Sequence, residues 1–281
     1  MITIGGTDIT GGTIDATDFT EITIDGTVAW ELIVDFNVYS ASIDDEVHKI
    51  DSSGNNVWKY TGHSTYVTAV AVDSNSYVYS AGYDYEVHKI DSSGSNVWKY
   101  TGHTDAVNAV AVDADGYVYS ASYDNELHKI DSDGDNVWAY TGHKYDVNVV
   151  AVDSNGYVYS GGDYEEVHKI DSSGNNVWKY TVHTGDVWGV AIDSDGYVYS
   201  GSWDMELHKI DSSGDNVWKY TGHSNYVKAV AVDSDGNVYS CGFDKEVHKI
   251  DSSGDNVWKY TGHSSYVYGV AVDPGIFSAG F

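Results

Sequence analysis

The chain has 281 residues, of which 43 are acidic and only 14 are basic, so its formal net charge at pH 7 is -29. All of the basic residues are Lys, and no Arg is present. A surface of this kind cannot displace the counterions of a phosphate backbone, so we expect no nucleic-acid partner.

The N-terminal segment, residues 1–26, is rich in Thr, Ile, Asp and Gly. Its short alternating runs, broken by Gly, predict β-strands joined by tight turns. The segment lacks the positive and apolar regions of a secretory signal peptide. No apolar run in the chain reaches the length of a membrane span, so we expect no membrane insertion. Cys241 is the single cysteine, and its repeat column elsewhere holds Ala or Gly, so we interpret it as a small packed residue.

Residues 27–281 form a repeat region with a period of 40 residues. The motif HKID begins at His48, His88, His128, His168, His208 and His248, and the motif VW ends at Trp58, Trp98, Trp138, Trp178, Trp218 and Trp258. Self-similarity at a fixed period of this size indicates a repeat architecture.

Each repeat carries four strand patterns, at residues 67–73, 77–82, 86–91 and 96–100 of one copy. The first is almost entirely apolar, as expected of a strand buried on both faces, and the turns between strands are rich in Asp, Ser and Gly. No helical periodicity is present. Short strands in groups of four predict an all-β fold, a β-propeller of four-stranded antiparallel blades.

The blade count follows from the strand patterns. The first-strand pattern occurs seven times, from 29–35 to 267–272, and the second-strand pattern also seven times, ending at 276–281, whereas the third and fourth occur six times. We predict seven blades, with residues 1–26 supplying the two missing strands so that strands from both termini close the propeller. The alternative is six blades, with the N-terminal segment docked elsewhere.

The repeat resembles the WD-repeat family in three columns: a Gly-His pair before the first strand, a Ser in the second strand and an Asp in the next turn. The resemblance implies a hydrogen-bonded set that pins each blade, formed by His63, His103, His143, His183, His223 and His263 with Asp44, Asp84, Asp124, Asp204 and Asp244. Ile50-Asp51 stands where the family has Trp-Asp, Val182 replaces one Gly, and Tyr164 occupies one Asp column. The VW motif resembles propellers of the quinoprotein type, in which such a Trp docks between blades.

Two loop clusters vary between repeats while the other columns barely change. In an antiparallel meander both clusters emerge on one face, and they are rich in aromatic residues, Asp and Asn. We interpret that face as a binding surface, since aromatic rings pack on sugars and anchor protein interfaces; the alternative is drift at loops after duplication. The candidate binding residues are Tyr66, Tyr83, Tyr85, Tyr123, Tyr145, Tyr164, Trp188, Trp203, Tyr226, Lys228, Phe243, Tyr266 and Tyr268.

No catalytic, metal or cofactor site is predicted. The twelve His residues fall in two repeat columns, which favours structural roles, and the Asp-rich turns lack the downstream bidentate Glu of a calcium loop. No motif of a nucleophile elbow, a zinc protease or a phosphate loop occurs. We therefore expect a protein that is not an enzyme.

The surplus of Asp and the lack of Arg resemble proteins of salt-loving archaea and their viruses, since concentrated salt screens such a charge. The Asp-rich propeller and the short leader resemble tail, baseplate or head-decoration proteins of tailed viruses of these hosts. The resemblance implies a non-enzymatic virion protein, assembled in the host cytoplasm, that contacts other virion proteins and binds a host-surface glycan or glycoprotein; homo-oligomerisation is left open. The alternatives are a scaffold for another protein of the same assembly, a cellular interaction protein, and a quinoprotein-like enzyme.

Overall fold

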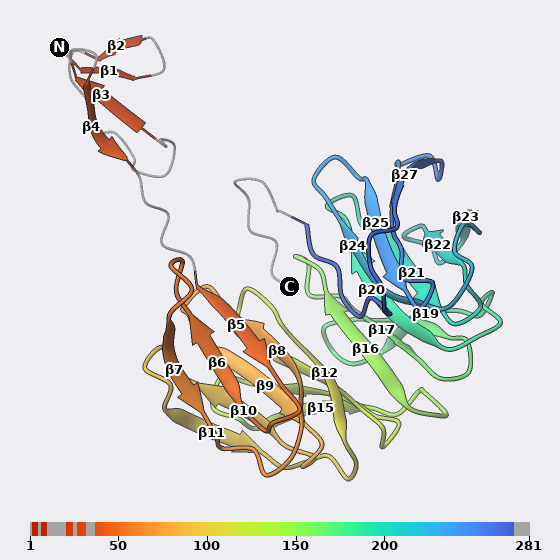
Figure 1. Ribbon diagram of the computed structural model, residues 1–281. Helices are drawn as coiled ribbons and strands as arrows, with labels where there is room; N and C mark the ends of the chain where they lie inside the picture. Colours follow the sequence, from red (N-terminus) through yellow and green to blue (C-terminus); the bar gives the residue numbers. More distant parts are fainter. Residues whose placement is uncertain (1, 5–6, 10–20, 25–26, 32–36, 273–281) are drawn as a thin grey trace. The chain divides into compact units, whose positions relative to one another are not determined.

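The structure is a computed structural model that describes residues 2–4, 7–9, 21–24, 27–31 and 37–272. All regular elements in these ranges are β-strands, as predicted (Figure 1). No helix in the described part of the chain is long and apolar enough to cross a membrane. The contacts divide the chain into two units, one of residues 1–38 with 49–57 and one of residues 39–48 with 58–281.

The N-terminal strands form an antiparallel sheet of their own. Its members are β1 (Ile2–Ile4), β2 (Thr7–Ile9), β3 (Glu21–Ile24) and β4 (Thr27–Glu31), in the order β2–β1–β3–β4. Trp30 pairs with Ile22 in this sheet, so the first-strand assignment over 29–35 is wrong in its described part. Residues 32–35 of that assignment lie outside the described residues.

The repeats fold into antiparallel sheets with the predicted strand order. Five four-stranded sheets consist of β8 (Val67–Val72), β9 (Val78–Gly82), β10 (Val87–Ile90) and β11 (Asn96–Tyr100); β12 (Val107–Val112), β13 (Val118–Ser122), β14 (Leu127–Ile130) and β15 (Asn136–Tyr140); β16 (Val147–Val152), β17 (Val158–Gly162), β18 (Val167–Ile170) and β19 (Asn176–Tyr180); β20 (Val187–Ile192), β21 (Val198–Ser202), β22 (Leu207–Ile210) and β23 (Asn216–Tyr220); and β24 (Val227–Val232), β25 (Val238–Gly242), β26 (Val247–Ile250) and β27 (Asn256–Tyr260). A three-stranded sheet precedes them, with β5 (Val38–Ala41), β6 (Val47–Ile50) and β7 (Asn56–Tyr60). Each sheet is one blade of a propeller-type fold.

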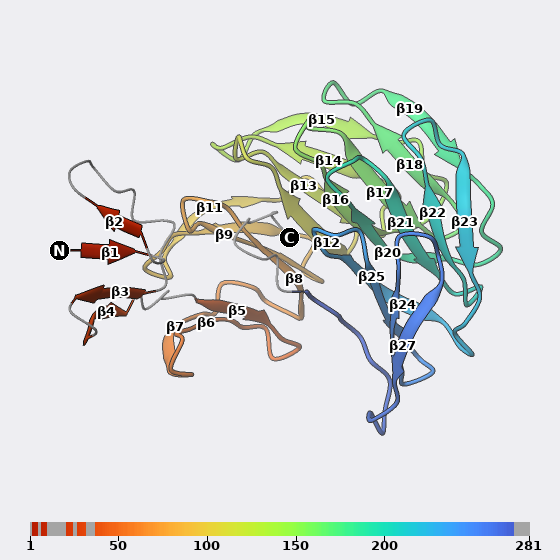
Figure 2. The ribbon, with the colours of Figure 1, turned by 90° about the horizontal axis from the view of Figure 1, so that it is seen from above.

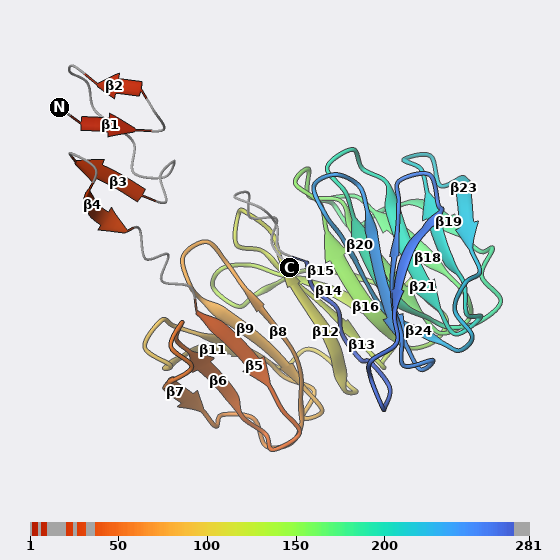
Figure 3. The same ribbon diagram turned by 45° about the horizontal axis from the view of Figure 1, so that its top comes forward.

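Neighbouring blades share their cores. The first strands contact one another in succession, β8 with β12, then β16, β20 and β24 (Figure 2; Figure 3). One buried cluster joins Tyr79 and Val87 of one blade to Val107 and Ile130 of the next, and equivalent clusters lie between the following blades. The second strand β9 is buried along its whole length because both of its faces meet another blade. The first strand β8, predicted to be buried on both faces, is only partly buried.

A glycine turn fixes the spacing of the blades. Gly94 has a φ of +85°, and a Cβ at this position would lie 2.9 Å from the ring of Trp58. Both the backbone conformation and the close approach require glycine. The indole Nε1–H of Trp58 donates to the carbonyl of Ser92 in the same turn at 3.1 Å. The DSSG turn of one blade is therefore the docking place for the Trp of the blade before it.

The prediction of seven blades is wrong for the described residues, which form six. Residues 267–272 repeat the first-strand pattern but form no strand, because no described strand pairs with them. Residues 276–281, predicted as a second strand, lie outside the described residues. In the described part of residues 1–26, β1 pairs with β2 and with β3. No hydrogen bond between described strands closes the ring.

Candidate functional site

The two variable loop clusters of each blade lie side by side. The amide of Tyr83 donates to the carbonyl of Tyr66 at 2.9 Å. The same main-chain bond joins Tyr123 to Ala106, Asp163 to Asp146, Trp203 to Asp186 and Phe243 to Tyr226. We call the side chains of these paired loops, together with the second residue of each first strand, the variable surface. Side chains add to this main-chain bond: Asp84 Oδ2 accepts from the Ser64 amide, and Ser122 Oγ donates to the Asp105 carbonyl.

The turn between the second and third strands has an unusual backbone. Its third residue has a φ between 69° and 72° at Asp45, Tyr85, Asn125, Met205 and Lys245. Residues other than Gly rarely adopt this left-handed conformation, which places the side chain at the tip of the turn. Tyr85 is 44% exposed there. A large apolar ring held in strain at an exposed tip is a feature that folding alone does not require.

Aromatic side chains of the variable surface form two small groups over the first blades. The Tyr83 ring lies 6.0 Å from Tyr66 and 6.2 Å from Tyr123, which belongs to the next blade. Tyr145 and Tyr164 are stacked at 4.6 Å. Their side chains are 46% and 57% exposed, so their outer faces are available to a ligand.

A longer series of aromatic rings crosses the last blades. Ring centroids are separated by 5.4 Å between Trp188 and Trp203, 4.8 Å between Trp203 and Tyr226, 5.9 Å between Tyr226 and Phe243, and 4.5 Å between Phe243 and Tyr266. Tyr268 lies edge-on to Phe243 at 5.5 Å. The variable surface therefore holds three separate aromatic groups rather than one continuous patch.

Lys228 closes one end of the aromatic series. Its Nζ lies 3.5 Å from the ring centroid of Trp188, which is a cation–π contact. Burial lowers the pKa of Lys228 to about 8. The indole Nε1 atoms of Trp188 and Trp203 are buried without a hydrogen-bond partner. This part of the surface is apolar and carries two unpaired donors, an arrangement that costs stability.

Carboxylates gather beside Tyr145 and Tyr164. Burial and the negative charges of Asp163 and Asp105 raise the pKa of Asp146. Burial raises the pKa of Asp186, and the charge of Asp163 adds to that increase. Asn148, almost fully buried, donates from Nδ2 to Asp163 at 2.8 Å. These acids were not among the predicted site residues, although they occupy the same variable columns as the aromatic ones.

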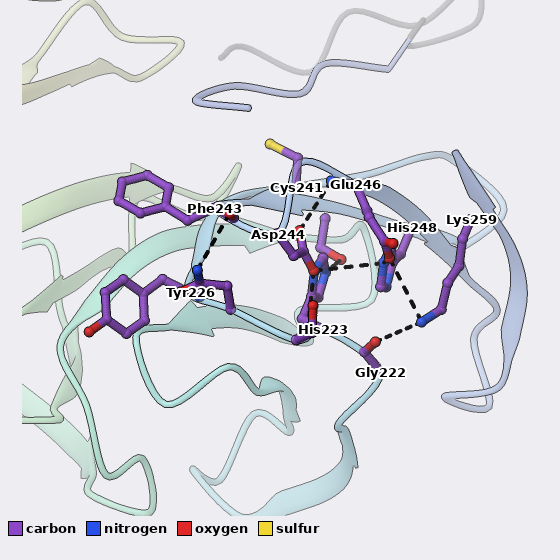
Figure 4. Close-up of polar contacts among 12 residues, drawn as sticks. Gly222, His223, Tyr226, Cys241, Phe243, Asp244, Glu246, His248 and Lys259 are labelled. Carbon is purple, nitrogen blue, oxygen red and sulfur yellow. Dashed lines mark hydrogen bonds and ion pairs between the residues drawn. The ribbon is translucent and has the colours of Figure 1, made fainter. Parts of the chain in front are cut away.

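The Gly-His, Ser and turn-Asp columns meet inside each of four blades. His63 Nδ1 donates to Asp84 at 3.0 Å, and Ser80 Oγ donates to His63 Nε2 at 2.8 Å. The same geometry joins His103 to Asp124, His183 to Asp204 and His223 to Asp244; Figure 4 shows the last of these. Burial raises the pKa of Asp124, but the bonds from His103 and the Thr104 amide outweigh it, and the pKa falls to about 2. We call each such set a pin.

Two of the predicted pins are incomplete. His143 Nε2 bonds Ser160 at 2.8 Å, but its buried Nδ1 has no partner because Tyr164 stands in the Asp column. At the ends of the repeat region, His263 and Asp44 are both exposed, and the structure does not join them.

The HKID histidines form the joints between blades. Tyr60 OH donates to His88 Nδ1 at 2.8 Å, and His88 Nε2 donates to Glu86 at 2.6 Å. Asn96 Nδ2 in turn donates to Tyr60 OH at 2.9 Å. The same bond joins Tyr100 to His128, Tyr140 to His168, Tyr180 to His208 and Tyr220 to His248.

The two histidines of a blade also stack on each other, at 3.8 Å for His63 and His88. Such pairs lie close enough to an acid to suggest a metal site, as at His63, Asp84 and His88. Both ring nitrogens of His63 and of His88 already hold hydrogen bonds, so no lone pair of this set points to a shared ion. In the equivalent set of His143, Glu166 and His168, the Nδ1 of His143 has no hydrogen-bond partner.

The chain matches the family described as outer membrane protein assembly factor BamB over residues 25–149 and 165–274. The match spans the repeat region and agrees with blades of four strands. No curated protein is significantly similar to the chain.

Proposed function

Because the chain belongs to the family of the outer membrane protein assembly factor BamB, whose repeats form propeller blades, we propose that it is a non-enzymatic binding protein that works through its variable surface. The observation that carries the proposal is the pairing of two loops in every complete blade, which brings exposed aromatic rings and carboxylates side by side on the variable surface. A folding role does not account for exposed rings such as Tyr145 and Tyr164.

The chemistry of the surface favours a glycan or a glycoprotein. Stacked tyrosines offer flat apolar faces to the C–H groups of a sugar, and the adjacent Asp163 and Asp146 can accept hydrogen bonds from hydroxyls. The same residue types also anchor protein interfaces. The second candidate is therefore a scaffold that holds another protein of the same assembly, which the printed name of the family favours.

The biological setting that we propose is the virion of a tailed virus of salt-loving archaea, with attachment to the host surface as the task. Composition supports it: a charge of -29 with no Arg is tolerated best where salt screens repulsion over a few ångströms. The proposal predicts that folding requires molar salt. Full folding in dilute buffer, measured by circular dichroism, would speak against this setting.

The binding proposal is tested by replacing two exposed rings. We expect the double variant Tyr145→Ser, Tyr164→Ser to bind host-envelope glycans with an affinity lowered about tenfold or more, because stacking on each ring contributes roughly 1 kcal/mol of binding free energy. Binding is measured on immobilised envelope glycans at molar salt. The matched control is Val137→Ser, Val177→Ser, which changes residues of similar exposure, 48% and 49%, on outer strands.

The outcomes separate the two candidates. Lost glycan binding with an unchanged melting temperature supports the glycan receptor. Retained glycan binding, with loss of a protein partner from purified assemblies, supports the scaffold. Equal behaviour of the double variant and its control in both assays contradicts a role for this surface.

A further inference from the structure

The blade β5–β6–β7 lacks a first strand and a pin histidine, and the end of the repeat region carries a first-strand sequence and a Gly-His pair that belong to no described blade. The blade has three strands where the others have four. It carries the pin residues Ser40 and Asp44 but has no Gly-His pair before it. The last Gly-His pair, Gly262-His263, is followed by the first-strand sequence of residues 267–272, which pairs with no strand among the described residues.

Residue spacing identifies the missing histidine. In the complete pins the Ser follows the His by 17 residues and the Asp by 21, as His63, Ser80 and Asp84 show. The stacked HKID histidine follows by 25, as His88 shows. Counting back from Ser40, Asp44 and His48 gives position 23 each time, which is Thr23. Six periods of 40 residues lead from 23 to 263, which is His263.

The last blade has lost the burial that a following blade gives. Tyr260 is 52% exposed, whereas its counterparts Tyr60, Tyr100, Tyr140, Tyr180 and Tyr220 are 2–8% exposed. Trp258 is 41% exposed, and with Val247, Lys259 and Tyr260 it lines an open hollow. In every joint the Tyr bonds a His that follows by 28 residues. For Tyr260, adding 28 residues and subtracting six periods of 40 residues gives position 48, which is His48.

The backbone already turns toward this arrangement. Val267 N donates to Gly242 O at 3.0 Å, as Val67 N donates to Ser42 O at 3.1 Å where the β8 strand begins. Residue 267 thus occupies the start of a first strand. In β8 and β9, Val70 lies opposite Ser80. The equivalent pair for the C-terminal segment is Val270 and Ser40.

We propose that the segment Thr261–Val272 supplies the missing first strand and the missing pin histidine of the chain's own blade β5–β6–β7, so that six blades close into a ring. His263 bonds Ser40 and Asp44, Tyr260 bonds His48, and Val270 pairs with Ser40. Closure also continues the variable surface, since Tyr266 then lies beside the turn at Asp44. The inference does not depend on the proposed binding function.

A double-mutant cycle tests the pin. We expect His263→Ala and Asp44→Ala each to lower the folding equilibrium constant, and the double variant to lower it by a factor about tenfold smaller than the product of the two single effects. The established pin, His103→Ala with Asp124→Ala, is the positive control. The pair His263→Ala with Asp84→Ala, which belong to different pins, is the negative control. Additive effects of His263→Ala and Asp44→Ala would overturn the proposal.

A second measurement does not depend on those variants. In the closed ring Tyr260→Phe lowers the melting temperature as much as Tyr220→Phe does, whereas an open last blade leaves it unchanged. Sedimentation at several protein concentrations identifies the partner. Coupling in a monomer supports closure within one chain. Coupling found only in concentration-dependent oligomers shows that a second copy supplies the blade, and overturns the proposal.

Discussion

At the scale of single residues, the fourth repeat departs most from the others. It has Asp163-Tyr164 where two other blades have Tyr-Asp, so the carboxylate that would bond His143 is displaced by one position. Asp163 instead accepts from Asn148, and two successive residues, Tyr164 and Glu165, have positive φ. The blade thus loses stability at its pin while its loop gains an exposed stacked pair of rings. A trade of this kind is typical of binding sites.

Exchanging the two residues should restore the pin. The double variant Asp163→Tyr, Tyr164→Asp is expected to stabilise the fold by about 1 to 3 kcal/mol, because the buried Nδ1 of His143 gains an acceptor. Denaturant unfolding at fixed salt measures the change. As the reciprocal control, Asp124→Asn should destabilise the blade with the intact His103 pin. Destabilisation by the exchange would contradict this account of His143.

Lys228 gives a residue-scale prediction with a defined pH dependence. Its folded pKa of about 8 lies below the ordinary Lys value, so the unfolded chain binds the extra proton between pH 8 and 10.5 and stability rises with pH across that range. Replacement by Met removes the buried charge and is expected to stabilise the protein at pH 7 by on the order of 1 to 3 kcal/mol. Melting curves of the variant and the parent should converge above pH 10. Lys99, which is exposed and paired with Glu86, is the control position.

At the scale of elements, the joint between blades is the unit that repeats most faithfully. Each joint uses the Trp of a fourth strand, the Tyr that ends it, and the HKID histidine of the following blade, as Trp138, Tyr140 and His168 illustrate. The joint also buries a lysine: Lys129 is 6% exposed and lies 4.0 Å from the Tyr117 ring. Cation–π contacts with tyrosines make that burial tolerable.

The joint predicts a large effect from a small change. Tyr140→Phe removes the hydroxyl that donates to His168 and accepts from Asn176, which leaves the buried Nδ1 of His168 unpaired. We expect a loss of about 1 to 3 kcal/mol in the free energy of unfolding. Tyr145→Phe, at a ring that is 46% exposed, should change it by less than about 0.5 kcal/mol. Similar losses for both variants would contradict the role of the joint.

Sequence periodicity predicts the strands well because each strand corresponds to a local sequence pattern. The assignment of 96–100 matches β11, and that of 67–73 exceeds β8 by one residue. The same reasoning fails at 267–272, where the letters are those of a first strand but no described strand stands opposite. A strand needs a partner as well as a pattern, and the partner depends on how the whole chain closes.

For the candidate site, repeat comparison identifies the columns but not the groups within them. Tyr145 and Tyr164 touch because their loops are hydrogen-bonded neighbours, whereas their separation from Tyr123 depends on distances between blades. The pKa of Asp146, raised by burial and by the charges of Asp163 in the paired loop and of Asp105 in the preceding blade, likewise cannot be predicted from a single loop. Burial of Lys129 was missed for the same reason, since alternation along one strand cannot reveal a second blade.

At the scale of the whole molecule, acid should unfold the protein through its repeated histidines. Burial and the neighbouring Gly-His histidine lower the pKa of His88, His208 and His248 to about 4. In the unfolded chain these histidines bind protons near pH 6.5, whereas in the folded chain they stay neutral down to about pH 4. Stability therefore falls as the pH drops from 6.5 to 4. Each histidine contributes at most about 1.4 kcal/mol per pH unit, and identical blades add their contributions.

Thermal melting between pH 8 and 4 at constant salt measures this effect. The melting temperature should be flat between pH 8 and pH 7 and fall steeply below pH 6. Asp124 and Asp204, whose pKa lies at about 2, add a further loss as the pH falls from 3.8 to 2, because their carboxylates must then accept protons. A melting temperature that stays constant from pH 7 to 5 would contradict neutral, buried histidines.

The main-chain bond between Tyr83 and Tyr66, repeated from blade to blade, holds the two variable loops together without using their exposed aromatic side chains. Because this bond uses amide and carbonyl groups, the exposed side chains of the loops can be exchanged as cassettes, one blade at a time, when the pin Asp and the Ser that bonds the opposite loop are kept. A library built on these positions would yield many specificities on a single acidic scaffold.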